Sequence, residues 1–171
     1  MDTTKRPIRI GGASGGFTDR VAAVTRLAKD PDVDAIVGDW LSENTMAPMG
    51  AAKASKSPNV MSLPLEERKK TGCFANTFLQ CFEPAIEYLA RNGAKLVVNA
   101  GGCDTELLAE VCLDMVKQKG YDFKVAWIEG DDVTKAVQEM VANGVEFKSV
   151  NTGRPLSEWN FEPLEIGRAH V

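Results

Sequence analysis

The stretch "IRIGGASGGFTDR", residues 8–20, places a short β-branched run before a glycine-rich turn. The residues that follow repeat an apolar stripe at helical spacing, formed by Val21, Val24, Leu27 and Ala28. This helix is predicted to end at Asp30-Pro31, because proline disfavours the helical conformation in the residue before it. A strand, a tight turn and a helix in this order begin a β-α-β unit, so the stretch predicts a parallel sheet.

The same alternation continues along the chain. Three further apolar runs are predicted as strands, "VDAIVGDW" (33–40), "AKLVVNAGG" (94–102) and "FKVAWIEGDD" (123–132), followed by a helix from Val133 to a stop at Asn143-Gly144 and then one short strand. Helical spacing fills the intervals, with a break expected at Pro84, and residues 41–71 show only one or two helical turns around 42–53. We therefore predict an α/β fold with a doubly wound, flavodoxin- or Rossmann-like sheet, mostly parallel and covered by helices on both faces.

Composition excludes several classes of function. The 171 residues carry a net charge of −4, so a basic face for nucleic acid is not expected. No apolar run is long enough to cross a membrane, and the first ten residues lack the core of a secretory signal, which favours a cytoplasmic location. Four cysteines without C-x-x-C spacing and a single histidine predict neither a zinc site nor a disulfide framework, and reduced thiols are expected.

The last seven residues, "EIGRAHV" (165–171), are interpreted as read-through of a sequencing adapter. On this interpretation residues 1–164 form a single α/β domain, truncated at its C-terminus and belonging to a longer protein. His170 would then be non-native, and no histidine would be left as the base for a nucleophile such as Cys103.

The glycine-rich turn has two interpretations. Gly11 and Gly16 have the spacing of a phosphate-binding P-loop, but Phe17 and Thr18 stand where that motif needs lysine followed by serine or threonine. A glycine turn before a helix still attracts anions through free N–H groups, or it is an empty tight corner. The candidate anion-binding residues here are Gly11, Gly12, Ser14, Gly15, Gly16 and Arg20.

Acidic and glycine residues follow every predicted strand, where ligands of open parallel sheets bind. Asp39 and Glu43 are the candidate catalytic carboxylates, since no helix-capping role explains them, and they could handle protons or a divalent cation. Asp104, Asp131 and Asp132 also fit a purely structural role as helix caps. The remaining candidate ligand-binding residues are Asn99, Gly101, Gly102, Glu129 and Asp131.

Four segments together resemble the N-terminal domain of the acyclic terpene utilisation family, the AtuA-type proteins. They are "RIGGASGGFTDR", "DAIVGDWLSENTMA", "KLVVNAGGCDTELLAEV" and "KVAWIEGDDV", and the resemblance runs from Arg6 to about Asn151. "CD" after "NAGG" departs from the expected pattern. The resemblance implies a cytosolic protein in the breakdown of acyclic isoprenoids such as citronellol and geraniol, whose acids are processed as CoA thioesters. Family members are longer than this chain.

Three functions are therefore carried forward. The first is an enzyme, or an enzyme component, acting on an isoprenoid acid or its CoA thioester, an anionic small molecule. The second is a non-catalytic binding or scaffold subunit with the same fold. The third, a nucleotide-binding protein of P-loop descent, is disfavoured by Phe17. The sequence leaves the cofactor, the metal and the oligomeric state open.

Overall fold

The computed structural model describes residues 6–15, 20–55 and 62–158. The chain divides into two compact units, Met1–Ile128 and Glu129–Val171, and each is described by itself. The candidate residue Gly16, the proposed caps Thr18 and Asp19, and the tail from 165 onward lie outside the described residues.

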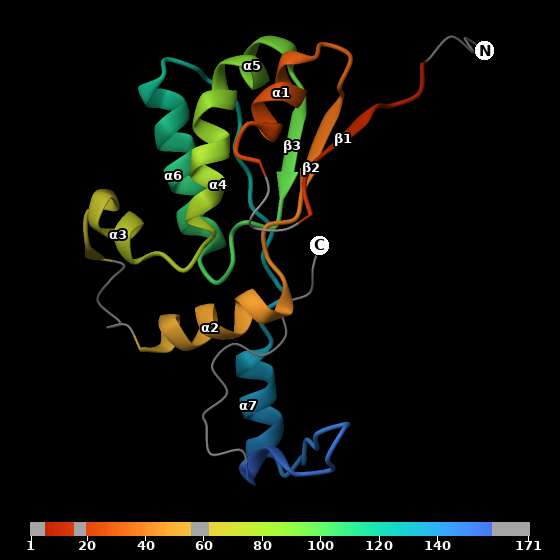
Figure 1. The fold of residues 1–171 in the computed structure, drawn as a ribbon. Helices are drawn as coiled ribbons and strands as arrows, with labels where there is room; N and C mark the ends of the chain where they lie inside the picture. The colour runs from red at the N-terminus through yellow and green to blue at the C-terminus, as the bar shows by residue number, and fades with distance from the viewer. Residues whose placement is uncertain (1–5, 16–19, 56–61, 159–171) are drawn as a thin grey trace, which may run out of the picture. The chain divides into compact units, whose positions relative to one another are not determined.

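The first unit contains a parallel sheet of three strands in the order β1-β2-β3 (Figure 1). The strands are β1 (Ile10–Ser14), β2 (Ala35–Gly38) and β3 (Lys95–Val98). Their register aligns Gly11 with Ile36 and Leu96. The predicted α/β class and the parallel arrangement are confirmed. The sequence predicts the first strand at "PIRIGGA" (7–13), and β1 overlaps it, so Gly11 and Gly12 of the glycine-rich stretch are strand residues.

Helices α1 (Ala23–Lys29), α4 (Asn76–Phe82), α5 (Ile86–Asn92) and α6 (Thr105–Gln118) contribute buried residues to one core with the inner sheet residues. The predicted break at Pro84 is confirmed, since a 3₁₀ turn at Glu83–Ala85 separates α4 from α5. Gly93 ends α5 with φ of +74°, the left-handed conformation that glycine adopts without steric cost. Ile36, Ile86, Val24, Val111 and Val116 are among the most deeply buried side chains.

Within the described part of the first unit, the sheet is covered by helices on one face. Ile36 at the centre of β2 is fully buried, whereas its neighbour Val37 is 45% exposed and Val97 is 54% exposed. The strand order explains this, because both crossovers step in the same direction. Right-handed crossovers then put both sets of connecting helices on the same face, as Figure 1 shows. A doubly wound sheet needs a reversal of strand order, and the described strands contain none.

The segment between β2 and α4 holds more helix than the sequence predicts. Helix α2 (Glu43–Ala54) carries Pro48 in its interior, and α3 (Leu65–Thr71) has no buried residue. The second helix escaped detection because its charges hide any apolar stripe. It is attached to α6 by ion pairs, in which Arg68 contacts Glu110 at 2.7 Å and Lys69 contacts Asp114 at 3.1 Å.

The predicted fourth strand is wrong. Residues 121–133 form neither helix nor strand, although Tyr121, Phe123 and Val125 pack against the core of the first unit. The apolar run therefore contacts the core, but such a run does not require the backbone to pair with a neighbouring strand. In the second unit, α7 (Thr134–Ala142) forms as predicted, and Lys148 and Pro155 make an isolated antiparallel bridge. A 3₁₀ turn follows at Leu156–Glu158.

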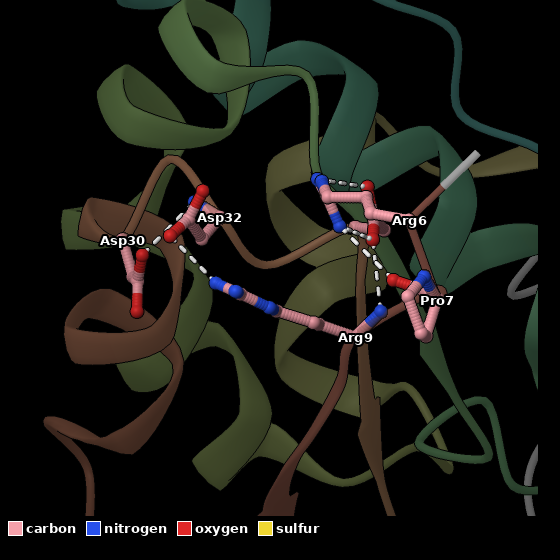
Figure 2. A network of polar contacts seen from close by, with 6 residues as sticks. Arg6, Pro7, Arg9, Asp30 and Asp32 are labelled. Atoms are coloured by element: carbon pink, nitrogen blue, oxygen red, sulfur yellow. Dashed lines mark hydrogen bonds and ion pairs between the residues drawn. The ribbon is translucent and has the colours of Figure 1, made fainter. Parts of the chain in front are cut away.

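An ionic network fixes the chain before β1 to the start of β2 (Figure 2). The Arg6 guanidinium donates two hydrogen bonds to the Asp34 carboxylate, of 2.7 and 2.9 Å, and the Arg9 backbone N–H donates a third of 2.8 Å. The Arg9 side chain reaches Asp32 at 2.5 Å. The Arg6 hydrogen bonds, helped by the Arg9 N–H, lower the pKa of Asp34 below its ordinary value of 3.8. The network lies at the amino ends of the strands.

This lowered pKa predicts a pH-dependent contribution to stability. A carboxylate whose pKa is lower in the folded state stabilises the fold above its ordinary pKa, and the contribution is lost as pH falls through the folded pKa. The difference in unfolding free energy between the wild type and Asp34→Asn is therefore expected to shrink below about pH 4. Urea titrations at neutral pH and at pH 3 measure it, and Arg6→Gln should remove most of the same pH dependence. A difference that stays constant across this range would contradict the assignment.

Candidate functional site

The ends of β1, β2 and β3 at Ser14, Gly38 and Val98 form what we call the carboxyl edge of the sheet. Ser14 and Asp39 are joined there twice: the Asp39 N–H donates to the Ser14 carbonyl at 3.0 Å, and the Ser14 hydroxyl donates to the Asp39 carbonyl at 2.8 Å. Two of the predicted site residues, 25 positions apart in the sequence, therefore lie in direct contact.

Asn99, the residue after β3, reaches the same place. Its amide Nδ2 donates to Asp39 Oδ1 at 2.6 Å and to the Leu41 carbonyl at 3.1 Å, while its Oδ1 accepts from the Trp40 N–H at 2.7 Å. Asp39 Oδ1 also accepts from the Leu41 N–H at 3.3 Å. The Asn99 side chain thus holds both the loop after β2 and the carboxylate of Asp39 in place.

The loop between β3 and α6 forms a second polar cluster at the carboxyl edge. Asp104 occupies the N-cap position of α6, as predicted, but its carboxylate makes no capping bond. It accepts instead from the Cys73 N–H at 2.6 Å and lies 3.5 Å from Lys53 Nζ. The Lys53 ammonium also donates to the Cys103 carbonyl. The cluster therefore ties α2, the start of α4 and the start of α6 together.

Most of the described glycines in β1, in β2 and in the loops that follow the strands have a packing role. A Cβ on Gly11 would lie 2.7 Å from Leu27, one on Gly38 would lie 2.0 Å from the Trp40 ring, and one on Gly101 would lie 2.7 Å from the Thr105 hydroxyl. Gly12 and Gly15 differ, because a Cβ at either position meets nothing within 4 Å. Gly12 belongs to the open face of the sheet, so among the described glycines of the carboxyl edge it is Gly15 that leaves space for a Cβ.

Glu43 and Arg20 lie at the starts of helical segments. Glu43 is the first residue of α2 and is exposed, and a carboxylate in the first turn of a helix is favoured by the helix dipole, a role that the sequence did not indicate. Arg20 is exposed just before α1, and its carbonyl accepts from the Ala23 N–H at 2.9 Å. Helix α1 has only seven residues, and no side chain caps its N-terminus.

Glu129 and Asp131 belong to the second unit and are described within it. The sequence predicts that both lie beside the ends of the other strands. This prediction depends on a fourth strand, which the described residues do not form. Their neighbour Asp132 accepts a hydrogen bond from the Thr134 N–H at 2.9 Å, as expected for a residue that caps α7.

Two residues of the carboxyl edge escaped the sequence analysis, Lys53 and Cys73. Lys53 lies on α2, within the segment of weak periodicity, and Cys73 lies in the turn before α4. No local motif marks either residue, because each acquires its partners only through long-range packing. Among the described residues, no group of three or more His, Cys, Asp and Glu side chains is placed to hold a metal ion. In that part of the chain no helix combines the length and apolar character needed to cross a bilayer.

A family comparison covers nearly the whole chain. The model of the acyclic terpene utilisation family protein AtuA matches residues 8–168. No curated protein and no solved structure matches the chain. The matched range includes all three strands and every residue of the carboxyl edge, in agreement with the resemblance seen in the four sequence segments. The chain therefore belongs to the acyclic terpene utilisation family.

Proposed function

We propose that this chain is an enzyme, or an enzyme component, of acyclic terpene breakdown that takes an isoprenoid-derived acid or its CoA thioester at the carboxyl edge. The observation that carries the proposal is the convergence of Ser14 and Asn99 on Asp39, to which each of them donates a hydrogen bond. Ligands of open parallel sheets bind outside the carboxyl ends of the strands. Membership of the family supports a substrate derived from an acyclic terpene.

Different residues of the carboxyl edge would bind the ligand and transfer protons. The carboxylate or phosphate groups of the ligand would approach the backbone at Gly15, where none of the described neighbours lies within 4 Å of a Cβ position. Asp39, whose Oδ1 is held by Asn99 and by the Leu41 N–H, would act on protons from a fixed position. Glu43, exposed in the first turn of α2, would be the second carboxylate.

The first test is a size series at Gly15. We expect Gly15→Leu to weaken binding of geranyl-CoA or citronellyl-CoA at least tenfold, about 1.4 kcal/mol, because the side chain enters the space that the ligand needs. Gly15→Ala should have a smaller effect. Isothermal titration calorimetry on the full-length protein measures the affinity, and urea unfolding checks that stability is kept. Equal affinity for Gly15→Leu and the wild type would contradict the site.

A matched pair of carboxylate variants locates the site at one end of the sheet. Asp39 and Asp34 flank β2 at opposite ends, and each accepts side-chain hydrogen bonds from a single partner residue. Asp39→Asn is expected to reduce thioester turnover or binding, whereas Asp34→Asn should change stability alone. Tight thioester binding by the full-length protein without turnover would favour a non-catalytic binding subunit.

A further inference from the structure

Helix α2 lies against the loop between β3 and α6. Met49 Sδ is 3.0 Å from the position that a Cβ on Gly102 would take. The Lys53 ammonium donates to the Cys103 carbonyl and lies 3.5 Å from the Asp104 carboxylate. Met49 and Lys53 are four residues apart, so they share one face of the helix. That face of α2 therefore lies on Gly102, which is buried and is one of the candidate ligand-binding residues.

Helix α2 is only lightly packed. Met46 and Met49 contact the core but are half-buried, and among the α2 side chains that the structure describes none is fully buried. A helix of this length is marginal in water by itself. Pro48 removes one hydrogen bond from its interior, and Gly50 lowers its helical propensity further. Helix α2 therefore depends on its contacts with the rest of the first unit to stay helical.

The two ends of α2 are attached in different ways. Before its start, Leu41 is buried, and its carbonyl accepts from Asn99 Nδ2 at 3.1 Å. Near its end, the described attachment is the Lys53 side chain, which is long, flexible and partly exposed. Ser42 lies between Leu41 and the first residue of the helix and has an extended backbone. A rotation at Ser42 would therefore lift the end of α2 and leave its start in place.

We propose that α2 is a lid over the loop between β3 and α6, held closed by Lys53 and opening at Ser42. In the closed position Met49 lies against Gly102, and the loop is covered. Release of Lys53 from the Cys103 carbonyl and from Asp104 exposes the loop to a ligand. Moving elements of this kind come from the least stable parts of a protein. The inference rests on the proposed function for the nature of the ligand, whereas the opening itself needs no ligand.

The first test is hydrogen exchange of the folded, full-length wild-type protein without ligand, at urea concentrations below its unfolding transition. We expect the amides of α2 to exchange at least about tenfold faster than those of α6, with little dependence on urea, because α2 loses its helical hydrogen bonds once it is detached. Equal rates and an equal urea dependence for α2 and α6 would mean that α2 opens only when the whole unit unfolds. That result would overturn the proposal.

A matched pair of lysine variants tests the attachment at Lys53. Lys53→Met is expected to speed exchange in α2 about tenfold and to leave α6 unchanged, because a hydrogen bond from a charged donor is lost. The control is Lys69→Met, which removes a lysine–aspartate pair between α3 and Asp114 of α6 and should leave α2 unchanged. An unchanged α2 in Lys53→Met, or an equal effect in Lys69→Met, would contradict the lid.

A second variant and a binding measurement complete the test. If Lys53→Met does not fold, Asp104→Asn removes the charge and keeps an acceptor for the Cys73 N–H, and the same faster exchange in α2 is expected. Calorimetry with geranyl-CoA separates this inference from the proposed function. Thioester binding without the exchange effect refutes the lid alone, whereas the exchange effect without thioester binding supports the lid and refutes the proposed function.

Discussion

Replacing Ile36 with alanine is expected to lower the free energy of unfolding by about 3–4 kcal/mol. Ile36 is fully buried at the centre of β2 and lies between Gly11 of β1 and Leu96 of β3. Removing three of its side-chain carbons leaves a cavity between the sheet and the helices, which packed neighbours fill only in part. Urea-induced unfolding, followed by circular dichroism, measures the loss.

The control is the next residue in the strand. Val37 points to the other face of the sheet and is 45% exposed, so Val37→Ala is expected to cost less than about 1 kcal/mol. Similar losses for the two variants would mean that both faces of the sheet are covered in solution. The comparison therefore tests the one-sided packing of the first unit directly.

The second large effect is expected at Gly102, where alanine should cost about 2–4 kcal/mol. Gly102 has φ of +53°, and a Cβ there would lie 2.6 Å from the Cys73 carbonyl oxygen and 3.0 Å from Met49 Sδ. The left-handed backbone and the contact with main chain both oppose a side chain, and a backbone oxygen cannot move aside as a flexible side chain can.

The variant Gly120→Ala separates the cost of the left-handed backbone from the cost of the steric contact. Its φ is +76°, but a Cβ there meets nothing within 4 Å, so Gly120→Ala carries the conformational cost alone, about 1 kcal/mol. The same unfolding measurement applies to both variants. If Gly102→Ala were no more destabilising than Gly120→Ala, the close approach of the β3–α6 loop to Cys73 would be contradicted.

The sequence predicted the three strands of the described sheet and most helices of the first unit, but it wrongly added a fourth strand at 123–132 and did not indicate the side on which the helices lie. Strand positions follow from apolar runs such as 33–40, and helix ends follow from Pro84 and Gly93, which act through local backbone preferences. Strand order depends instead on which runs pair, and no local signal in a parallel sheet specifies it. The doubly wound arrangement was inferred from alternation alone, and the described strands step in one direction.

The contacts of the candidate site were likewise predictable only in part. The meeting of Ser14, Asp39 and Asn99 could be predicted, since parallel strands end at one edge and each of these residues follows or ends a strand. The contacts of Lys53, Cys73 and Asp104 could not, because they join three helices across segments without periodicity. At Gly11 the glycine spacing suggested anion binding, but the structure gives another reason for a glycine there, because the Leu27 side chain packs against it.

The pairing of β1 with β2 shifts between Gly12 and Ser14, so that Ser14 rather than Ala13 pairs with Gly38. Alternation along a regular strand would send the side chain of residue 14 to the uncovered side. Because of the extra residue, Ser14 is in register with Gly38 instead. Ala13 is buried, and the Ser14 hydroxyl donates a hydrogen bond to the Asp39 carbonyl. One inserted residue in a five-residue strand thus determines that the side chain of Ser14 bonds to the loop after β2.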